Sequence, residues 1–302
     1  MSKLITVFGA TGNQGGSVIR HILADATLSK TFKIRGITRD VTKPAAQALA
    51  KQGVETVKAD LSSKASLTDA IRGSHTVFLV TNYWESASYD IEVTQGKNVV
   101  DIAKEEGVQH LIFSSLLSVK KATNGRLSHV PHFDGKADIE EYIKQSGVPG
   151  TFFLPGYFMS NYDSMIQKNE DGSFGLAYPV GKDAKFPLVN IADTGKWVNA
   201  IIKNRDTLLG KHVYAAADYY TPTRILAELE EVTGAKTTYT QVPGDVYKSF
   251  LPEFMAEEML ENHLFIEEPG YYNGAGLEES LAILEEKPES WKEYAARTFG
   301  KK

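Results

Sequence analysis

Short apolar runs alternate with amphipathic stretches through the first half of the chain. The run LITVFGA at residues 4–10 is apolar on both faces and contains β-branched residues, which is typical of a buried strand in a parallel sheet. Residues 15–26 then carry apolar side chains at helical spacing. The pattern repeats, and it predicts strands at 32–39, 54–60, 75–81, 109–116 and 150–156, separated by helices at 45–53, 66–73, 90–107 and 135–146.

This alternation predicts an α/β fold with a Rossmann-type, doubly wound parallel sheet and right-handed crossovers. The regularity fades after residue 156. Residues 185–204 suggest a short strand that leads into a helix, and 211–218 suggest another strand. We therefore expect a first domain at 1–156, with 187–217 returning to it. A smaller, mostly helical C-terminal domain would comprise 157–186 and 218–302.

Composition narrows the functional classes. Of the 302 residues, 42% are hydrophobic and 24% are charged, which is ordinary for a globular protein with a substantial core. The net charge of −5 provides no basic surface for nucleic acid. Cysteine is absent, which excludes disulfides and cysteine nucleophiles, and we expect no metal site. No segment reaches about 18 uninterrupted apolar residues. We expect a protein of the cytoplasm, or of cytoplasm and nucleus, that binds neither membranes nor nucleic acid directly.

The loop VFGATGNQGGSVI places Gly9, Gly12 and Gly15 between a predicted strand and a predicted helix. Dinucleotide-binding loops occur in this context. The glycines allow a tight turn and a close approach of the backbone to a pyrophosphate, which then lies at the positive end of the helix dipole. A dinucleotide cofactor is therefore expected.

The end of the second predicted strand bears on the choice of cofactor. An NAD site usually has an acidic residue here for the ribose hydroxyls. This chain has Thr38 followed by Arg39, with Lys43 nearby, and Asp40 comes one position late. A guanidinium can pair with a 2′-phosphate through two hydrogen bonds, which favours NADP(H) over NAD(H). The alternative is that Arg39 and Lys43 are simply solvated loop charges.

Together with that loop, the segments ITRD, HFDGKADIEEYI and LPGYFMSN resemble the NmrA-like family of atypical short-chain dehydrogenase/reductases. The resemblance covers most of the chain, most firmly residues 1–165. It implies an NADP(H)-binding Rossmann domain, a small C-terminal domain and a cleft between them. The family includes fungal nitrogen-metabolite regulators, a human NADPH sensor and reductases.

The resemblance also implies roles for residues at strand ends and on one helix. Contacts with the pyrophosphate are assigned to Gly9, Thr11, Gly12, Asn13, Gln14 and Gly15, and contacts with the 2′-phosphate to Arg39 and Lys43. Asp60 and Leu61 would flank the adenine, and Thr81 and Asn82 would approach the ribose and nicotinamide side. Lys136 would bind the nicotinamide ribose, and the nicotinamide would be covered by Pro155, Gly156, Tyr157 and Phe158.

The proton donor is the open question. Ordinary members of the wider superfamily carry Tyr-x-x-x-Lys on one helix face, but this chain has His132 four residues before Lys136. An imidazole can transfer protons, so His132 is a candidate acid. Against it, Pro131 and Gly135 suggest that the helix starts only at about Lys136, leaving His132 in a loop. The resemblance extends to reductases that border on this family, in which Lys alone can serve the proton-transfer role, and it implies that Lys136 is the better single catalytic candidate.

Two functions remain after these observations. A complete dinucleotide site with an incomplete proton-donor pair favours a redox-sensing regulator, involved in transcription regulation through a protein partner. The alternative is an NADPH-dependent oxidoreductase that reduces a small-molecule carbonyl, quinone or imine with Lys136, aided by His132. A cofactor-free interaction module is the third hypothesis.

Overall fold

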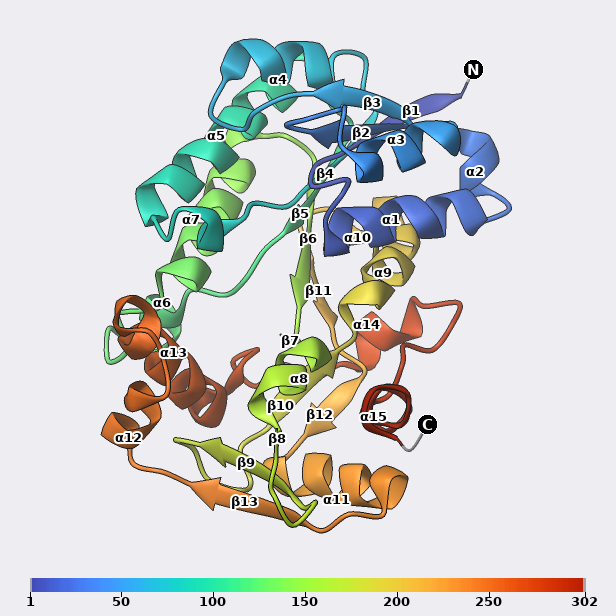
Figure 1. The fold of residues 1–302 in the computed structure, drawn as a ribbon. Helices are drawn as coiled ribbons and strands as arrows, with labels where there is room; N and C mark the ends of the chain where they lie inside the picture. The colour runs from blue at the N-terminus through green and yellow to red at the C-terminus, as the bar shows by residue number, and fades with distance from the viewer. Residues whose placement is uncertain (1, 301–302) are drawn as a thin grey trace.

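A seven-stranded parallel sheet forms the centre of the molecule in the computed structural model, which describes residues 2–300 (Figure 1). Its strand order is β11-β6-β5-β4-β1-β2-β3. The strands are β1 Lys3–Val7, β2 Phe32–Thr38, β3 Glu55–Lys58, β4 Thr76–Leu79, β5 His110–Ser114, β6 Gly150–Pro155 and β11 His212–Ala215. The prediction of a doubly wound α/β fold is confirmed, and the six strands expected in the first half all form.

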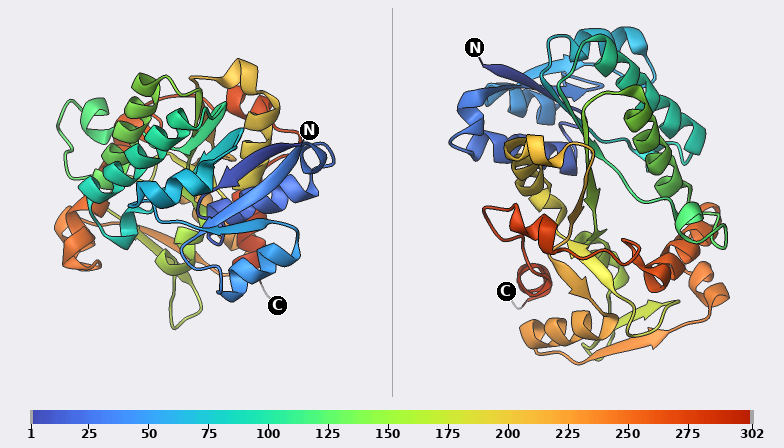
Figure 2. Two further views of the ribbon diagram at one scale, coloured as in Figure 1. Left: turned by 90° about the horizontal axis from the view of Figure 1, so that it is seen from above. Right: turned by 180° about the vertical axis from the view of Figure 1, so that it is seen from behind.

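Helices cover both faces of this sheet (Figure 2). One face carries α1 (Asn13–Ala24) and α9 (Thr194–Lys203), and the other carries α4 (Lys64–Ile71), α5 (Tyr89–Glu105) and α7 (Pro131–Ser146). Each face buries its own apolar cluster, as expected for a sheet covered on both sides. The shorter helices of this half are α2 Leu28–Thr31, α3 Pro44–Lys51, η1 Tyr83–Glu85, α6 Val119–Ala122 and α10 Arg205–Leu208.

Helices α5 and α7 pack unusually closely. A Cβ atom added to Gly96 of α5 would lie 2.5 Å from Ile139 of α7, and Gly135 of α7 faces Glu92 of α5. The two glycines thus let the helix backbones approach each other. This approach places the first turn of α5 beside the start of α7, where several of the candidate site residues lie.

The chain after β6 builds two small sheets beside the carboxyl edge of the large one (Figure 1). One has the order β12-β10-β7 and the other β13-β9-β8, and both mix parallel and antiparallel pairs. The strands are β7 Tyr157–Phe158, β8 Gln167–Lys168, β9 Phe174–Tyr178, β10 Phe186–Val189, β12 Asp218–Tyr220 and β13 Thr237–Gln241. Thus, of the two strands expected between 185 and 218, β11 joins the large sheet and β10 does not.

Helices complete this second half of the molecule. They are η2 Met159–Asn161, α8 Tyr162–Met165, η3 Ile191–Asp193, α11 Pro222–Thr233, α12 Gly244–Ser249, α13 Glu253–Phe265, η4 Ile266–Gly270, α14 Glu278–Ala282 and α15 Trp291–Phe299. Within residues 2–300, no helix combines the length and the apolar character that a membrane span requires.

Candidate functional site

The carboxyl edge of the large sheet gathers the residues that the sequence singled out. The loops after β1, β2, β3, β4 and β6 all leave the sheet at this edge, because its strands are parallel. Ligands of open α/β sheets bind beyond this edge. The sequence-predicted residues between Gly9 and Phe158 therefore share one region, and Lys136 reaches it from α7.

The glycine loop has the backbone that its sequence predicts. Gly9 has a φ of +63°, a left-handed conformation that glycine adopts without strain. A Cβ atom on Gly15 would lie 2.3 Å from the Gly9 carbonyl oxygen, so α1 can start this close to the loop only with glycine there. The loop is thus a tight turn that runs directly into a helix N-terminus.

The first turn of α1 is open for an anion. No side chain caps the helix at Gly12, and within residues 2–300 no backbone carbonyl accepts from the N–H groups of Asn13, Gln14 or Gly15. Thr11, Gly12 and Asn13 are exposed to solvent. Ser114 Oγ, at the end of β5, donates to Gln14 Oε1 at 2.9 Å. The residues present therefore fit a pyrophosphate, which these free N–H groups would hold.

The charges after β2 are accessible from solvent. Arg39 forms an ion pair with Glu85 of η1, and both side chains are largely exposed. Asp40 accepts hydrogen bonds from the Thr42 hydroxyl at 2.6 Å and the Thr42 backbone N–H at 2.9 Å, and the Thr42 hydroxyl lowers the pKa of Asp40. This carboxylate is thereby engaged in its own turn, while Lys43 is exposed at the start of α3.

Loops after β3 and β4 line the next part of the edge. Asp60 Oδ1 accepts from the Ser62 backbone N–H at 2.8 Å, and the Leu61 carbonyl accepts from Asn98 at 3.0 Å. Asn82 is exposed, whereas Thr81 is buried against α7.

Lys136 lies in a buried polar cluster at this edge. Its ammonium group donates to Thr81 Oγ1 at 2.8 Å and forms an ion pair with Glu92 of α5. The Glu92 side chain is 1% exposed, and its other carboxylate oxygen, Oε2, has no partner within residues 2–300. Burial lowers the pKa of Lys136, and the Glu92 charge opposes that effect. The cluster therefore places a cation, held by a carboxylate, beside the loop after β4.

The expectation that His132 lies in a loop before α7 is wrong. The helix starts at Pro131, so His132 occupies its first turn and shares a face with Lys136, one turn later. The physical reason is that proline suits the first helical position, where its missing N–H is not needed and its fixed φ is helical. Gly135 remains inside the helix because α5 packs closely against it.

His132 is held by a carboxylate from a distant part of the chain. Its Nδ1 is hydrogen-bonded to Glu258 of α13, and its backbone N–H donates to the same oxygen at 3.2 Å. Tyr83 Oη donates to the other carboxylate oxygen of Glu258 at 3.1 Å. Burial, followed by the charge of Glu258, raises the pKa of Tyr83 above its ordinary value, so this hydroxyl remains a donor.

A second pair of the same kind joins α13 to the segment before α7. His129 Nδ1 lies 2.7 Å from Glu261 Oε1, and the His129 backbone N–H donates to Glu261 Oε2 at 2.6 Å. The proximity of α13 to α6 and α7 is visible from front and back (Figures 1 and 2). Helix α13 is thus tied to the start of α7 through two histidines.

Ser115, which follows the last residue of β5, contacts a different carboxylate from α7. It donates to Glu140 Oε2 at 2.6 Å, and Glu140 also accepts from Lys144 and contacts His212. Because hydrogen bonds from three side chains converge on this carboxylate, we interpret the group as structural.

The segment after β6 is mostly buried. The Tyr157 side chain points into an aromatic cluster, where its hydroxyl lies 3.3 Å from Tyr178 Oη, and Phe158 is half-buried. A Cβ atom on Gly156 would lie 2.1 Å from the Pro187 carbonyl oxygen, so this close approach requires glycine. The Pro155 carbonyl accepts from Tyr271 Oη at 3.1 Å.

Sequence reasoning missed Glu92 and Glu258. Glu92 shares a helix face with Gly96 and Val99, so an acidic residue in an otherwise apolar stripe was a usable signal. Glu258 carried no such signal, because α13 is acidic around much of its circumference and the sequence gives no sign that His132 would contact it.

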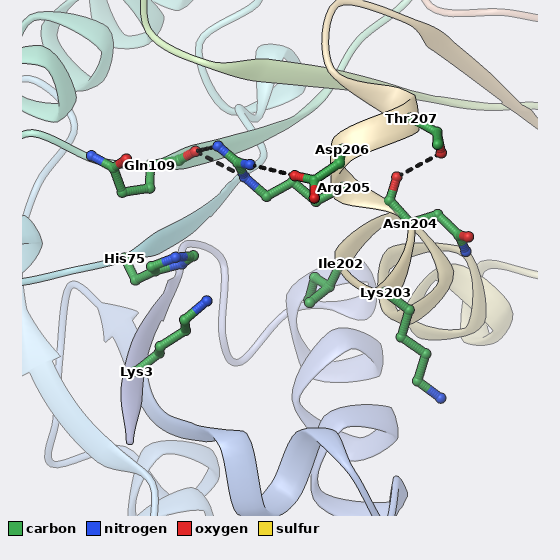
Figure 3. Close-up of a pocket in the computed structure, with 9 residues that line it drawn as sticks. All are labelled: Lys3, His75, Gln109, Ile202, Lys203, Asn204, Arg205, Asp206 and Thr207. Carbon is green, nitrogen blue, oxygen red and sulfur yellow. Dashed lines mark hydrogen bonds and ion pairs between the residues drawn. The ribbon is translucent and has the colours of Figure 1, made fainter. Parts of the chain in front are cut away.

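The opposite edge of the sheet holds an open pocket of about 430 Å³ (Figure 3). Lys3 and His75 line it, while Arg205 donates from Nε and Nη2 to the Gln109 carbonyl at 3.1 and 2.7 Å. These residues precede or begin β1, β4 and β5, so the pocket lies at the amino ends of the strands, away from the candidate site. Among residues 2–300, no group of acidic or histidine side chains is arranged to hold a metal ion.

Comparisons with known proteins agree with this architecture. The model of the NmrA-like family matches residues 1–295. The chain is 36% identical over 261 residues to the NmrA-like family domain-containing oxidoreductase malD of Malbranchea aurantiaca, with 80% of this chain and 76% of that protein covered.

Solved structures share the fold. NmrA, a negative transcriptional regulator solved in complex with NADP, superposes with a TM-score of 0.83 at 22% identity, covering 99% of this chain and 95% of that one. The Citrobacter sp. triphenylmethane reductase, complexed with NADP(H), gives 0.81 at 22% identity, covering 97% and 99%. The resemblance inferred from the sequence is confirmed, and the chain belongs to the NmrA-like family.

Proposed function

We propose that this protein is an NADPH-dependent oxidoreductase that reduces a carbonyl, quinone or imine of a small molecule. One observation carries the proposal: His132 and Lys136 lie one turn apart on the same face of α7, beside the carboxyl edge of the sheet. The regulator favoured from the sequence depended on an incomplete proton-donor pair. That argument weakens once His132 lies inside the helix, facing the same side as Lys136.

Relatives support the same choice. The curated proteins that resemble this chain at 28–36% identity are mostly named NmrA-like family domain-containing oxidoreductases. Binding of NADP(H) is supported by the free N–H groups at the start of α1, and by the exposed cations Arg39 and Lys43 after β2.

Each residue of the site would have its own role in binding the cofactor or in the reaction. Reduced nicotinamide, when bound, supplies a hydride. The Gly9–Gly15 loop holds the pyrophosphate, and Arg39 with Lys43 pairs with the 2′-phosphate. Lys136 donates to the nicotinamide ribose and stabilises negative charge that develops on the substrate. A proton must reach the substrate oxygen or nitrogen from α7, where Lys136 and His132 are the candidate donors.

The test is oxidation of NADPH by purified protein with a panel of quinones, aldehydes and imines. We expect turnover with at least one class, and a loss of about 10²-fold or more in kcat/KM for Lys136→Ala, the size typical of losing a positioned proton donor or charge. Lys97→Ala, a change at an exposed lysine of α5, is the control and should retain activity.

Two results would count against the proposal. NADPH binding without turnover of any acceptor would favour the redox-sensing regulator that acts through a protein partner. Absence of binding to NADPH and NADH would remove both functions and leave an interaction module.

A further inference from the structure

Glu258 receives hydrogen bonds from three donors that belong to two other parts of the chain. These are His132 Nδ1, the His132 backbone N–H and Tyr83 Oη. The side chain of Glu258 is 8% exposed and that of His132 is 12% exposed. A buried carboxylate with this many donors has a fixed orientation, and it fixes its partners in turn.

The contact with Glu258 determines which nitrogen of His132 is available. An ionised carboxylate accepts only, so Nδ1 must carry a hydrogen. Within residues 2–300, Nε2 forms no hydrogen bond, although the ring is mostly enclosed by protein. The imidazole is therefore held in one tautomer, with Nε2 as the nitrogen that can give or take a proton.

Aromatic rings hold the imidazole from the sides. The ring of Trp84 lies 5.1 Å from that of His132, and the ring of Tyr83 lies 5.9 Å away, measured between centroids. Trp84 is 45% exposed, so the side of the His132 ring that faces Trp84 lies close to solvent. Both aromatic residues follow Thr81, whose hydroxyl holds Lys136. One loop after β4 thus contacts both candidate groups of α7.

We propose that His132 delivers the substrate proton through Nε2 and that Glu258 is the positioning residue that orients it. This inference rests on the proposed function and deepens it. As the substrate carbon accepts a hydride, the C=O or C=N π electrons move to the heteroatom. That atom takes the Nε2 proton of the imidazolium, leaving a neutral imidazole with Nδ1–H still donating to Glu258. Solvent then restores the proton.

The division of labour with Lys136 follows from their contacts. The ammonium group of Lys136 is engaged by Glu92 and Thr81 in a buried cluster, which suits a fixed positive charge. His132 has a free nitrogen and lies nearer the solvent-exposed Trp84, which suits a group that must be reprotonated.

The simpler explanation is that Glu258 only ties α13 to α7. The second pair, His129 with Glu261, provides a matched control for it, because it comes from the same helix and uses the same two kinds of hydrogen bond. The side chain of His129 is 65% exposed, so this pair links α13 to the segment before α7 at the protein surface. If both pairs only link α13 to the segment around the start of α7, substitutions in either pair should affect the protein in the same way.

The first experiment reads the imidazole directly. Wild type, Glu258→Gln and Glu261→Gln are labelled with ¹⁵N-histidine, and the histidine tautomers are read by NMR with NADP⁺ present. His132→Gln assigns the His132 signals. We expect the Nδ1–H tautomer for His132 in wild type and in Glu261→Gln, and a mixture of the two tautomers in Glu258→Gln only. The Nε2–H tautomer in wild type, or identical His132 signals in the three proteins, would overturn the proposal.

The second experiment measures turnover. With an acceptor that wild type reduces, we expect His132→Gln to lower kcat about 10²-fold and Glu258→Gln about tenfold, with NADPH affinity unchanged. Glu261→Gln should behave as wild type. Full activity in His132→Gln, or equal losses in Glu258→Gln and Glu261→Gln, would overturn the role of His132.

The outcomes also separate this inference from the proposed function. An active wild type with active His132→Gln would remove the inference alone. A wild type that reduces no acceptor would remove the proposed function, and the proton-delivery role with it.

Discussion

Arg39 is the single side chain on which the proposed preference for NADPH depends most. It is largely exposed at the end of β2, and its present partner is another exposed residue, Glu85. Exposed ion pairs contribute at most about 1 kcal/mol, so Arg39 can exchange this carboxylate for a phosphate at little cost. A 2′-phosphate, with two charges and three oxygens, is the stronger partner.

Replacement of Arg39 should therefore weaken one cofactor selectively. We expect Arg39→Ala to reduce NADPH affinity about tenfold, or about 1.4 kcal/mol, and to leave NADH affinity within about twofold. Isothermal titration calorimetry with both cofactors measures this difference. Arg72→Ala, which removes another exposed arginine with an acidic partner, is the control. Equal losses for NADPH and NADH would contradict a contact with the 2′-phosphate.

Residue types at strand ends were enough to predict where the candidate site lies, because parallel strands bring their carboxyl ends to one edge. The side-chain partners were not predictable in the same way. Glu258 lies far from His132 in the sequence, and its approach depends on how α13 packs. The helical position of His132 was predictable from Pro131, had its preference for the first helical position been weighed.

The pairing of α5 with α7 is the feature that positions Lys136. Glu92 holds Lys136 from α5, and the two helices approach closely because Gly96 lets Ile139 pack against the backbone. An ordinary helical glycine is replaced by alanine with a gain of about 1 kcal/mol. Gly96 should behave in the opposite way.

We expect Gly96→Ala to lower the free energy of unfolding by about 1–3 kcal/mol, because its Cβ would overlap Ile139. Ile139→Ala removes the obstructing atoms, so Gly96→Ala should be much less harmful in that background. Urea unfolding of the four proteins gives the coupling energy. Gly96→Ala with wild-type or higher stability would show that the helices do not need this close approach.

At the scale of the whole molecule, the strands of the large sheet followed from the sequence and most strands of the small sheets did not. Strands such as β4, β5 and β6 have apolar runs that predict burial, and they are buried along their whole length. Strands such as β7 and β8 have two residues each and form only because partners meet them. No local pattern encodes those partners, so the small sheets could not be predicted.

Buried histidines make the stability of the whole protein sensitive to acid. Burial lowers the pKa of His110 to about 3 and that of His263 to about 4. An unfolded histidine has a pKa near 6.5, so the unfolded chain binds protons below that pH that the folded protein does not. Each contribution to stability is complete above pH 6.5 and decreases as pH falls toward the folded value.

We expect each of these histidines to account for about 2 kcal/mol of lost stability between pH 7 and pH 5. Urea unfolding at the two pH values measures the loss, which should be smaller in His110→Gln. His129→Gln is the contrasting variant. Its partner Glu261 raises the pKa of His129, so its contribution is complete at low pH and disappears as pH rises. An unchanged loss in His110→Gln would contradict this account.

The position of β11 has a consequence for synthesis on the ribosome. Strand β6 is completely buried, yet its outer neighbour is made only after the chain has passed through β7, β10 and α9. At roughly 5–20 residues per second, the nascent chain carries an unpaired apolar strand edge for several seconds. Such an edge is a template for pairing with other chains. Chaperone supply and the rate of translation between β6 and β11 should therefore govern how much of this protein reaches its native state.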